Sequence, residues 1–391
     1  MRIGIFGGSF DPIHFGHIRT AQAVFDKYCL DRFFFVPTGV SPGKSSKQPQ
    51  CSLSDRWTLL SAAIRDFPDF YIYAAEINSP CVSYTADTIR NISLLFPEAE
   101  LYLIVGSDLL PSFFQWFRID YILQKVHLII VERDGEAVDA YFSNPALKAA
   151  DRMRSSSACS STDIRKCLAA GLPISDAVPP KVENFIYARG LYLPDLYAKI
   201  STDIKRRQTP KRYLHSIGVV KTAVGLCNRL HIDSENILIA AILHDIAKEL
   251  PFEKLYGLTG EEKTGFSRTT IKAVLHAPAG AVLAQKLYPV SQETYRAILL
   301  HCTLDDIMTV QDKILYLADI IEPSRRIFPT LLRLRELCEE MHSEAELDKI
   351  IILAIEQNIC YIRDNGGEVH PASLRALRTL KNKSERCTWK H

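Results

Sequence analysis

The stretch RIGIFGGSFDPIHFGH, residues 2–17, decides the fold of the first half of this chain. Its apolar beginning predicts a short buried strand, and the residues that follow it have the apolar spacing of an amphipathic helix. Gly7, Gly8, Ser9 and Phe10 connect the two. Glycine has no side chain, so the backbone of this connection can approach a bound phosphate closely. A strand, a glycine-rich connection and a helix together predict an α/β fold.

Short apolar runs and amphipathic stretches alternate along the whole first half. The runs predict strands at residues 3–6, 33–36, 71–74, 101–105 and 126–131. This alternation is typical of a Rossmann-like, doubly wound parallel sheet with helices on both faces. Residues 1–195 are therefore predicted to form one α/β domain.

The second half has the periodicity of helices and no strand pattern. Helices are predicted at residues 213–230, 237–250, 294–301, 312–321 and 347–362. A proline, a polar run and three basic residues interrupt the apolar pattern over residues 194–207, which places the domain boundary there. Residues 196–391 are predicted to form an all-α domain.

Composition excludes several classes of protein. The 391 residues exceed what one hydrophobic core usually organises, and 47% hydrophobic with 24% charged residues is typical of a globular protein. No apolar stretch reaches the roughly 18 to 20 residues of a membrane span, and no signal peptide is recognised, so we expect a cytoplasmic protein without a membrane role. Ten cysteines without a Cys-x-x-Cys pair favour reduced thiols, and a net charge of +2 does not favour nucleic acid as a partner.

Two histidines and a distant basic motif point to phosphate chemistry in the first half. His14 and His17 lie three residues apart at the expected start of a helix, where backbone N–H groups and the helix dipole favour an anion. The motif SSTDIR at residues 160–165 combines hydroxyls with an arginine at another expected helix start, although its first serines could be only an N-cap. Together the two motifs resemble the nucleotidylyltransferase superfamily.

Within that superfamily, the first half is similar to bacterial nicotinate-nucleotide adenylyltransferase. The similarity includes SYTADT at residues 83–88, VGSD at residues 105–108, Trp116, and the tail at residues 178–192. It implies transfer of AMP from ATP to nicotinate mononucleotide, with Mg²⁺ on the polyphosphate, to form deamido-NAD and pyrophosphate. Transfer to another acceptor, such as phosphopantetheine, is the alternative.

The resemblance also implies roles for individual residues. His14 and His17 are expected to contact the ATP phosphates, and Arg165, Ser161 and Thr162 the departing pyrophosphate. The remaining ATP- or substrate-binding positions are Gly7, Gly8, Ser9, Phe10, Lys44, Thr85, Gly106, Asp108 and Trp116. Asp108 would position the ribose or base, and Thr85 and Trp116 the nicotinate ring, unless the tryptophan is purely structural. The chain departs from the family at residues 42–44, where PGK replaces Pro-His-Lys and so removes an imidazole beside Lys44.

A second set of histidines and aspartates lies in the helical half. His244 and Asp245 are adjacent inside an apolar run, where burial is costly without a partner. A metal is such a partner, and the further candidate ligands are His215, His276, His301 and Asp319. Six candidates exceed the four ligands of one tetrahedral zinc, so the set favours two metals that share a bridging aspartate.

The order of these ligands resembles the HD-domain phosphohydrolases, and within them the bacterial symmetrical diadenosine tetraphosphate hydrolases. The similarity covers residues 210–380 through YLHS at 213–216, LHDIAK at 243–248, HAPAGA at 276–281 and LADIIEP at 317–323. It implies cleavage of diadenosine tetraphosphate into two ADP at two metal ions, iron being expected, with Lys248 and Arg325 on the phosphates.

One departure and two alternatives remain for the helical half. After His301 the chain reads CTLD at residues 302–305, where the family has Thr followed by Ser or Thr and Gly. This change leaves the preferred nucleotide open. The half could instead be a regulatory module that senses nucleotides or forms a homo-oligomer, or it could act on a different nucleotide. The preferred hypothesis is a bifunctional enzyme.

Overall fold

The structure is a computed structural model of residues 1–391, and it describes all of them except 40–48, 75–83, 133–137, 155–158, 260–267 and 389–391. The chain divides into two compact units, of which the first comprises Met1–Lys166 and Ile174–Phe185. The second unit comprises Cys167–Pro173 and Ile186–His391. The chain therefore passes between units upstream of residues 194–207, where the sequence pattern places the boundary.

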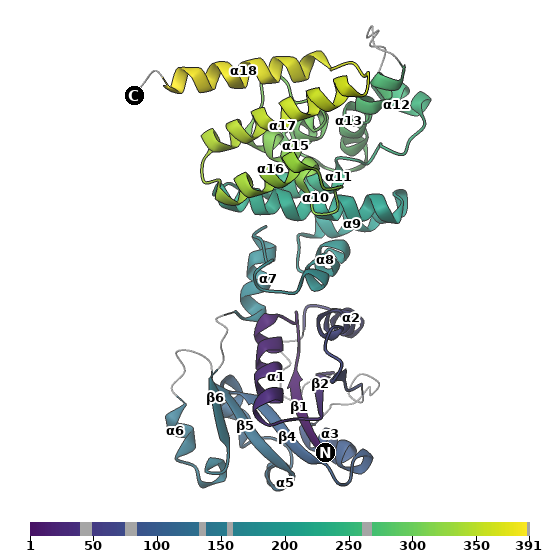
Figure 1. Cartoon of the computed structure of the whole chain (residues 1–391). Coiled ribbons are helices and arrows are strands. Elements are labelled where there is room, and N and C mark those ends of the chain that lie inside the picture. The colour runs from purple at the N-terminus through teal and green to yellow at the C-terminus, as the bar shows by residue number, and fades with distance from the viewer. Residues whose placement is uncertain (40–48, 75–83, 133–137, 155–158, 260–267, 389–391) are drawn as a thin grey trace. The chain divides into compact units, whose positions relative to one another are not determined.

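The first unit is built on a six-stranded parallel sheet with strand order β3-β2-β1-β4-β5-β6 (Figure 1). The strands are β1 (Arg2–Gly8), β2 (Arg32–Pro37), β3 (Phe70–Ile72), β4 (Glu100–Gly106), β5 (Val126–Glu132) and β6 (Asp151–Arg154). The order reverses between β1 and β4, so the carboxyl ends of these two strands form the crevice where such sheets bind ligands. The predicted α/β class is confirmed.

Strand β6 has no counterpart in the apolar pattern of the sequence. Its four residues, DRMR, are exposed or half-buried, and it pairs only with β5 at the edge of the sheet. An edge strand with one neighbour needs no continuous apolar run, because much of its surface faces water. Hydrophobic patterning therefore predicts strands β1 to β5, including the short aromatic edge strand β3, and not this one.

Helices flank the sheet on both faces. They are α1 (Phe15–Lys27), α2 (Leu53–Ile64), α3 (Thr85–Leu95), α4 (Leu110–Phe113), α5 (Ile119–Lys125), α6 (Asp139–Phe142), α7 (Ser161–Ala169) and α8 (Pro180–Arg189), with 3₁₀ turns η1 (Ser107–Leu109) and η2 (Pro145–Leu147). The core is made by inward-facing strand residues such as Ile5, Leu103 and Ile130, each at most 2% exposed, packed against Ile89 of α3 and Ile122 of α5. Burial of this apolar surface holds the strand ends, and hence the crevice, in place.

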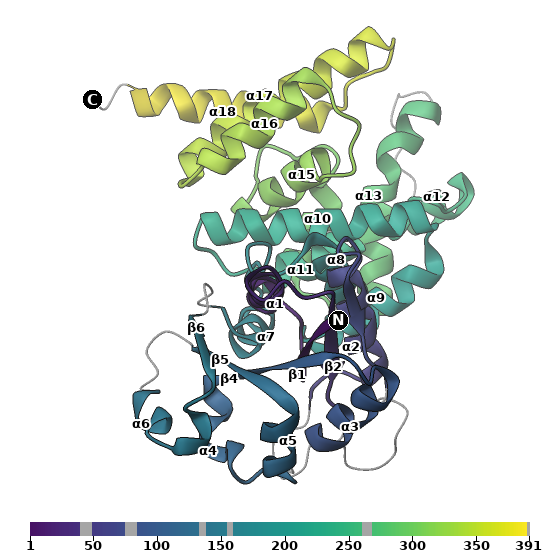
Figure 2. The same cartoon turned by 60° about the horizontal axis from the view of Figure 1, so that its bottom comes forward.

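The second unit is helical throughout its described part (Figures 1 and 2). Its helices are α9 (Asp195–Arg207), α10 (Pro210–Arg229), α11 (Glu235–Leu243), α12 (Phe252–Thr259), α13 (Arg268–Leu287), α14 (Gln292–Leu300), α15 (Val310–Ile321), α16 (Pro329–Glu340), α17 (Glu344–Asp364) and α18 (Pro371–Thr388). Helix α10 packs against α11 and α15, and α14 packs against α11, α13 and α15. None of the helices in the described ranges has both the length and the apolar character that crossing a membrane requires.

Two segments differ from the expected helical pattern. Residues 194–207, where the apolar pattern is interrupted, nevertheless contain helix α9, which buries Tyr197, Ile200 and Ile204. The helix predicted at 237–250 ends at Leu243, and a series of turns follows. Side chains satisfy the backbone there: the His244 ring bonds to the Ala241 carbonyl at 2.8 Å, and Gln208 donates to the Asp245 carbonyl at 3.2 Å. Helix termini need such partners for their last carbonyls.

Candidate active sites

The sheet-edge site of the first unit begins at the amino end of α1. His14 is the N-cap of this helix and is 6% exposed, and its ring lies 3.7 Å from that of His17, measured between ring centroids. No acidic residue occupies the first turn of α1. The positive end of the helix dipole and two imidazoles are therefore directed toward one place, which suits a phosphate.

The distant basic motif reaches the same loop. Ser161 at the start of α7 donates to the Pro12 carbonyl at 2.9 Å, and Arg165 donates to the Asp11 carbonyl through one guanidinium nitrogen. The other terminal nitrogen of Arg165 lies 3.2 Å from the Thr162 hydroxyl. Folding thus brings two motifs about 150 residues apart into contact with the loop that precedes His14.

Gly106 and Asp108 lie at the carboxyl end of β4, beside the end of β1. The Asp108 side chain folds back over Gly106 so closely that a Cβ at Gly106 would lie 2.4 Å from its Oδ1 atom. Only glycine therefore fits under the carboxylate in this position. Gly7 and Gly8 end β1 on the neighbouring strand, so the four residues share the crevice edge.

A side chain of α2 anchors the loop that follows β1. Arg56 is buried and donates to the Ser9 carbonyl at 2.7 Å and to the Thr38 carbonyl at 2.9 Å. Phe10 has a positive φ of 47° and is 1% exposed, with its ring 5.1 Å from the His17 ring. Phe10 is thus a packing residue that supports His17. Lys44 lies outside the described residues.

The aromatic residues after β4 have different environments. Trp116 is half-buried and packs edge-on against Phe113, with ring centroids 5.0 Å apart. Its neighbour Phe117 is half-exposed and lies 4.6 Å from the ring of Tyr84, the N-cap of α3. Thr85 is the first residue of that helix. Tyr84 lies within the SYTADT motif, whereas Phe117 was not singled out by any sequence motif.

The helical site of the second unit collects all six predicted ligands. His215 comes from α10, and His244 and Asp245 follow α11. His276 comes from α13, His301 follows α14 and Asp319 comes from α15. The four histidines are each at most 8% exposed, and Asp245 is 3% exposed. Five helices with distant sequence positions therefore supply one buried polar cluster.

The two oxygens of Asp245 divide this cluster into two. Cluster one comprises His215 Nε2, His244 Nε2, Asp245 Oδ2 and Asp319 Oδ1. Within it, the distances from Asp245 Oδ2 are 3.9 Å to His215 and 3.6 Å to His244, and Asp319 lies 3.0 and 3.8 Å from the same two nitrogens. Cluster one therefore has the composition and spacing of a nitrogen and oxygen metal site.

Cluster two surrounds the other carboxylate oxygen of Asp245, Oδ1. It comprises His276 Nε2, His301 Nε2, Asp245 Oδ1 and Cys302 Sγ. Asp245 Oδ1 lies 3.3 Å from His276 Nε2 and 3.9 Å from His301 Nε2, and the two imidazole nitrogens are 3.2 Å apart. Lys248 lies beside this cluster, with its Nζ 2.8 Å from His276 Nε2.

Three of the histidines are oriented by their other ring nitrogen. His244 Nδ1 bonds to the Ala241 carbonyl and His301 Nδ1 bonds to the Ile298 carbonyl, at 2.8 and 2.7 Å. His215 Nδ1 lies 2.9 Å from the buried carboxylate of Glu322. A carbonyl accepts only from an N–H, so His244 and His301 each carry a proton on Nδ1, and in the neutral ring the lone pair is on Nε2. That is the form in which imidazole binds a metal.

Charge at the helical site is set by burial and by close partners. Burial lowers the pKa of His244 to about 4, so its ring is neutral at pH 7. Burial lowers the pKa of His215, but hydrogen bonds to Asp319 and Glu322 outweigh it and raise the pKa to about 9. Burial raises the pKa of Asp245, yet the neighbouring His244, His276 and Lys248 hold it well below its usual range. Ionised carboxylates beside imidazoles are the donors that a divalent cation needs.

An orphaned atom shows that these residues fit a metal. His244 is fully buried, and its Nε2 has no hydrogen-bond partner in the described part of the chain. A buried nitrogen without a partner is costly, and a metal ion would satisfy it. The candidate ligand groups are His215 with His244 and Asp245, His244 with His301 and Asp319, and His276 with His301 and Cys302.

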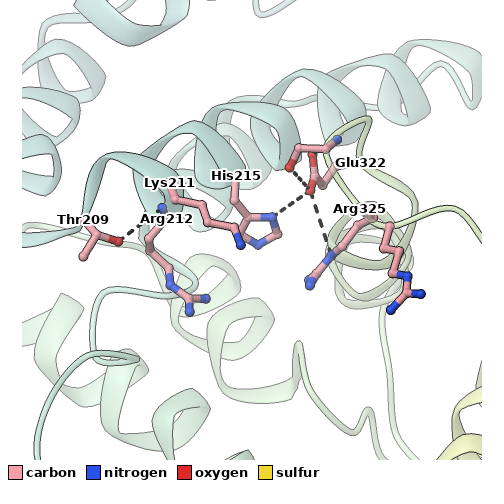
Figure 3. A pocket seen from close by; sticks show the side chains of 8 residues that line it. Thr209, Lys211, Arg212, His215, Glu322 and Arg325 are labelled. Atoms are coloured by element: carbon pink, nitrogen blue, oxygen red, sulfur yellow. Dashed lines mark hydrogen bonds and ion pairs between the residues drawn. The ribbon is translucent and has the colours of Figure 1, made fainter.

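A basic cavity of about 350 Å³ opens beside cluster one (Figure 3). Its cationic lining residues are Lys211, Arg212, Arg325 and Arg326. Arg212 donates to Asp245 Oδ2 at 2.5 Å, and Arg325 is bonded to Asp319 Oδ1. The cavity thus joins positive charge directly to the candidate metal ligands, as a phosphate-binding site would require.

Some residues of the helical site could not be assigned from motifs alone. Arg212 is missed, although it lies one helical turn before His215, a spacing that puts both on one face. Glu322 is missed as the partner of His215, and a Cβ at Gly218 of α10 would lie 2.5 Å from its Oε2 atom. The close approach of Glu322 to α10 therefore depends on a glycine that has no motif signal.

Comparisons with known proteins agree with this division. Residues 5–167 match the family model described as cytidylyltransferase-like, and residues 212–324 match the HD domain model. A protein of Saccharopolyspora erythraea named probable nicotinate-nucleotide adenylyltransferase is 35% identical over 192 residues, which are 49% of this chain and 89% of that protein. A protein of Opitutus terrae with the same name is 36% identical over 194 residues, which are 50% of this chain and 99% of that protein. The chain belongs to the nicotinate-nucleotide adenylyltransferase family.

These relatives correspond to only half of the chain, and the family match accounts for the first unit. The second unit contains the HD domain. A solved structure from Clostridium acetobutylicum, described as a predicted HD superfamily hydrolase involved in NAD metabolism, is 32% identical, with a TM-score of 0.44. It covers 48% of this chain and 97% of that chain. The curated relatives and the HD domain model together show an adenylyltransferase-family protein with an additional HD domain.

Proposed function

We propose that the chain is a bifunctional enzyme. The first unit transfers AMP from ATP to nicotinate mononucleotide, and the HD domain hydrolyses diadenosine tetraphosphate symmetrically to two ADP. For the first activity, the supporting observation is the contact of Ser161 and Arg165 with the loop before His14. For the second, it is the division of six buried ligands into two clusters on Asp245 beside a basic cavity.

In adenylyl transfer, a phosphate oxygen of nicotinate mononucleotide attacks the α-phosphorus of ATP. The bond from that phosphorus to the oxygen shared with the β-phosphate breaks, and pyrophosphate leaves with the electron pair. The attacking phosphate is already ionised at neutral pH, so the site needs no general base. Arg165 places positive charge at the phosphates and the His14 and His17 rings are hydrogen-bonding groups there, so catalysis is positioning and charge stabilisation. Mg²⁺ would neutralise further polyphosphate charge when bound.

In the hydrolysis, water adds to one of the two central phosphorus atoms and the bond to the central bridging oxygen breaks. The products are two ADP and, with both new terminal phosphates ionised, two protons. Metal ions held by the two clusters, with iron as our expectation, would lower the pKa of water and neutralise phosphate charge. Arg212 bonds to the Asp245 carboxylate and Arg325 bonds to the Asp319 carboxylate. Both arginines line the cavity, so they are placed to bind the substrate phosphates next to the candidate ligands. Lys248, which lies beside cluster two, would bind a substrate phosphate there.

Product analysis tests both activities on one preparation. We expect the full chain with ATP and nicotinate mononucleotide to give deamido-NAD and pyrophosphate. We expect the iron-loaded chain with diadenosine tetraphosphate to give ADP as the sole product. ATP plus AMP would contradict symmetrical cleavage. Hydrolysis of other nucleotides, with no hydrolysis of diadenosine tetraphosphate, would indicate that the HD domain acts on a different substrate, which is the alternative raised by the CTLD turn. A metal-free HD domain without hydrolysis would favour the regulatory alternative.

A further inference from the structure

Cys302 lies inside cluster two rather than beside it. Its Sγ is 3.2 Å from His276 Nε2 and 3.3 Å from His301 Nε2. The same two nitrogens are 3.2 Å apart, and Asp245 Oδ1 lies 3.3 and 3.9 Å from them. Five of the six distances among these four atoms therefore fall between 3.2 and 3.9 Å.

These distances are those of donor atoms around a single ion. Nitrogen, oxygen and sulfur bind zinc at about 2.0 to 2.3 Å, and a tetrahedron of that radius has edges of about 3.3 to 3.8 Å. A thiol that only packs beside two imidazoles would not need to lie at this donor-to-donor distance from both nitrogens at once. In the neighbouring cluster one, the buried His244 Nε2 has no hydrogen-bond partner in the described part of the chain and independently indicates a cation. The two clusters adjoin, because the ligand atoms of His244 and His301 lie within 4.8 Å of each other.

We propose that Cys302 is a thiolate ligand of the metal in cluster two, which makes this site a two-nitrogen, one-oxygen, one-sulfur site. The proposal rests on the HD domain holding metal, as the proposed function requires, and adds a ligand to it. Cluster one has only nitrogen and oxygen donors. A soft sulfur donor favours zinc, iron or cobalt over magnesium or manganese, so the two clusters differ in the metals they select.

Cobalt(II) is the probe for this ligand, because a cobalt–thiolate bond gives a near-ultraviolet charge-transfer band that imidazole and carboxylate ligands do not give. Metal-free full-length protein is titrated with cobalt(II) alone, and bound metal is counted by elemental analysis. We expect the band in the wild type and its loss in Cys302→Ser with cobalt still bound. Cys360→Ser, which changes an exposed cysteine on α17, is the matched control and should keep the band.

Alkylation provides a second measurement that does not depend on colour. Zinc should protect Cys302 from iodoacetamide, as measured by peptide mass spectrometry, while Cys360 stays reactive. Cys302→Ser should also weaken binding of the second zinc at least about tenfold, the loss that even outer-sphere partners can cause. Cobalt bound without the band, a band that persists in Cys302→Ser, or no cobalt bound would each overturn the proposal. Hydrolysis assays are separate, so a wrong substrate assignment leaves this result unaffected.

Discussion

The sheet-edge site and the helical site obtain their chemistry from different parts of the chain. At the sheet edge, glycines at the ends of β1 and β4 and the amino end of α1 supply backbone groups to the proposed phosphate site. In the helical site, side chains from five helices converge, and backbone carbonyls serve to orient side chains such as His244 and His301. A site built largely from backbone groups tolerates most side-chain substitutions. A site built from candidate metal-ligating side chains depends on every one of those side chains.

Removal of Asp245 should give the largest effect. Asp245→Ala deletes the carboxylate that both clusters share, so both metals lose a ligand. We expect hydrolysis of diadenosine tetraphosphate to fall by about 10³-fold or more, since metal ions contribute several kcal/mol to such reactions. Adenylyl transfer should be unchanged. Asp364→Ala, at the exposed end of α17, is the control, and an equal loss in both activities would refute the separation of the two sites.

Removal of His17 should reverse this pattern. His17→Ala deletes an imidazole at the amino end of α1, so charge stabilisation of the ATP phosphates is reduced. We expect kcat for adenylyl transfer to fall by about 10²- to 10³-fold, as for loss of one electrostatic donor, with hydrolysis unaffected. His127→Ala, an exposed histidine of β5, should change neither rate. Full adenylyl transfer in His17→Ala would remove His17 from the site.

Glu322 tests whether the helical site depends on positioning as well as ligation. Glu322→Gln replaces the carboxylate that holds His215 at 2.9 Å with an amide, which no longer fixes the ring tautomer. We expect metal affinity, measured by competition with a chelator, to fall about 10- to 100-fold. Glu336→Gln, on the exposed surface of α16, should leave affinity unchanged. Unaltered metal affinity in Glu322→Gln would reduce Glu322 to a packing role.

Gly106 tests the backbone character of the sheet-edge site, with the smallest expected effect. In Gly106→Ala the new Cβ would lie 2.4 Å from Asp108 Oδ1, so the carboxylate must swing away. The flexible side chain can move at little cost in stability. We expect KM for ATP to rise about tenfold, the loss of one hydrogen bond to a charged group, with the melting temperature nearly unchanged. Gly225→Ala in α10, where a Cβ meets nothing within 4 Å, is the control. A large fall in stability with unchanged KM would make the glycine structural only.

Several features were predictable because local chemistry requires them. Apolar runs that are buried on both faces predicted the longer strands, since a buried strand needs a continuous hydrophobic pattern. The six candidate metal ligands were predictable as a set, because histidine and aspartate in apolar surroundings need partners. The polar edge strand β6 and the end of α11 at Leu243 were not predictable, because a neighbouring strand and side-chain caps determine them.

Sequence alone predicts the α/β and all-α halves, the phosphate motifs and the identity of the candidate ligands. Tertiary packing sets how Asp245 divides those ligands between its two oxygens, and which further side chains reach them. Arg212, Glu322 and Cys302 acquire their partners from helices distant in the chain. Hydrophobic periodicity records which face of a helix is buried, but the distances between donor atoms depend on how several helices pack together.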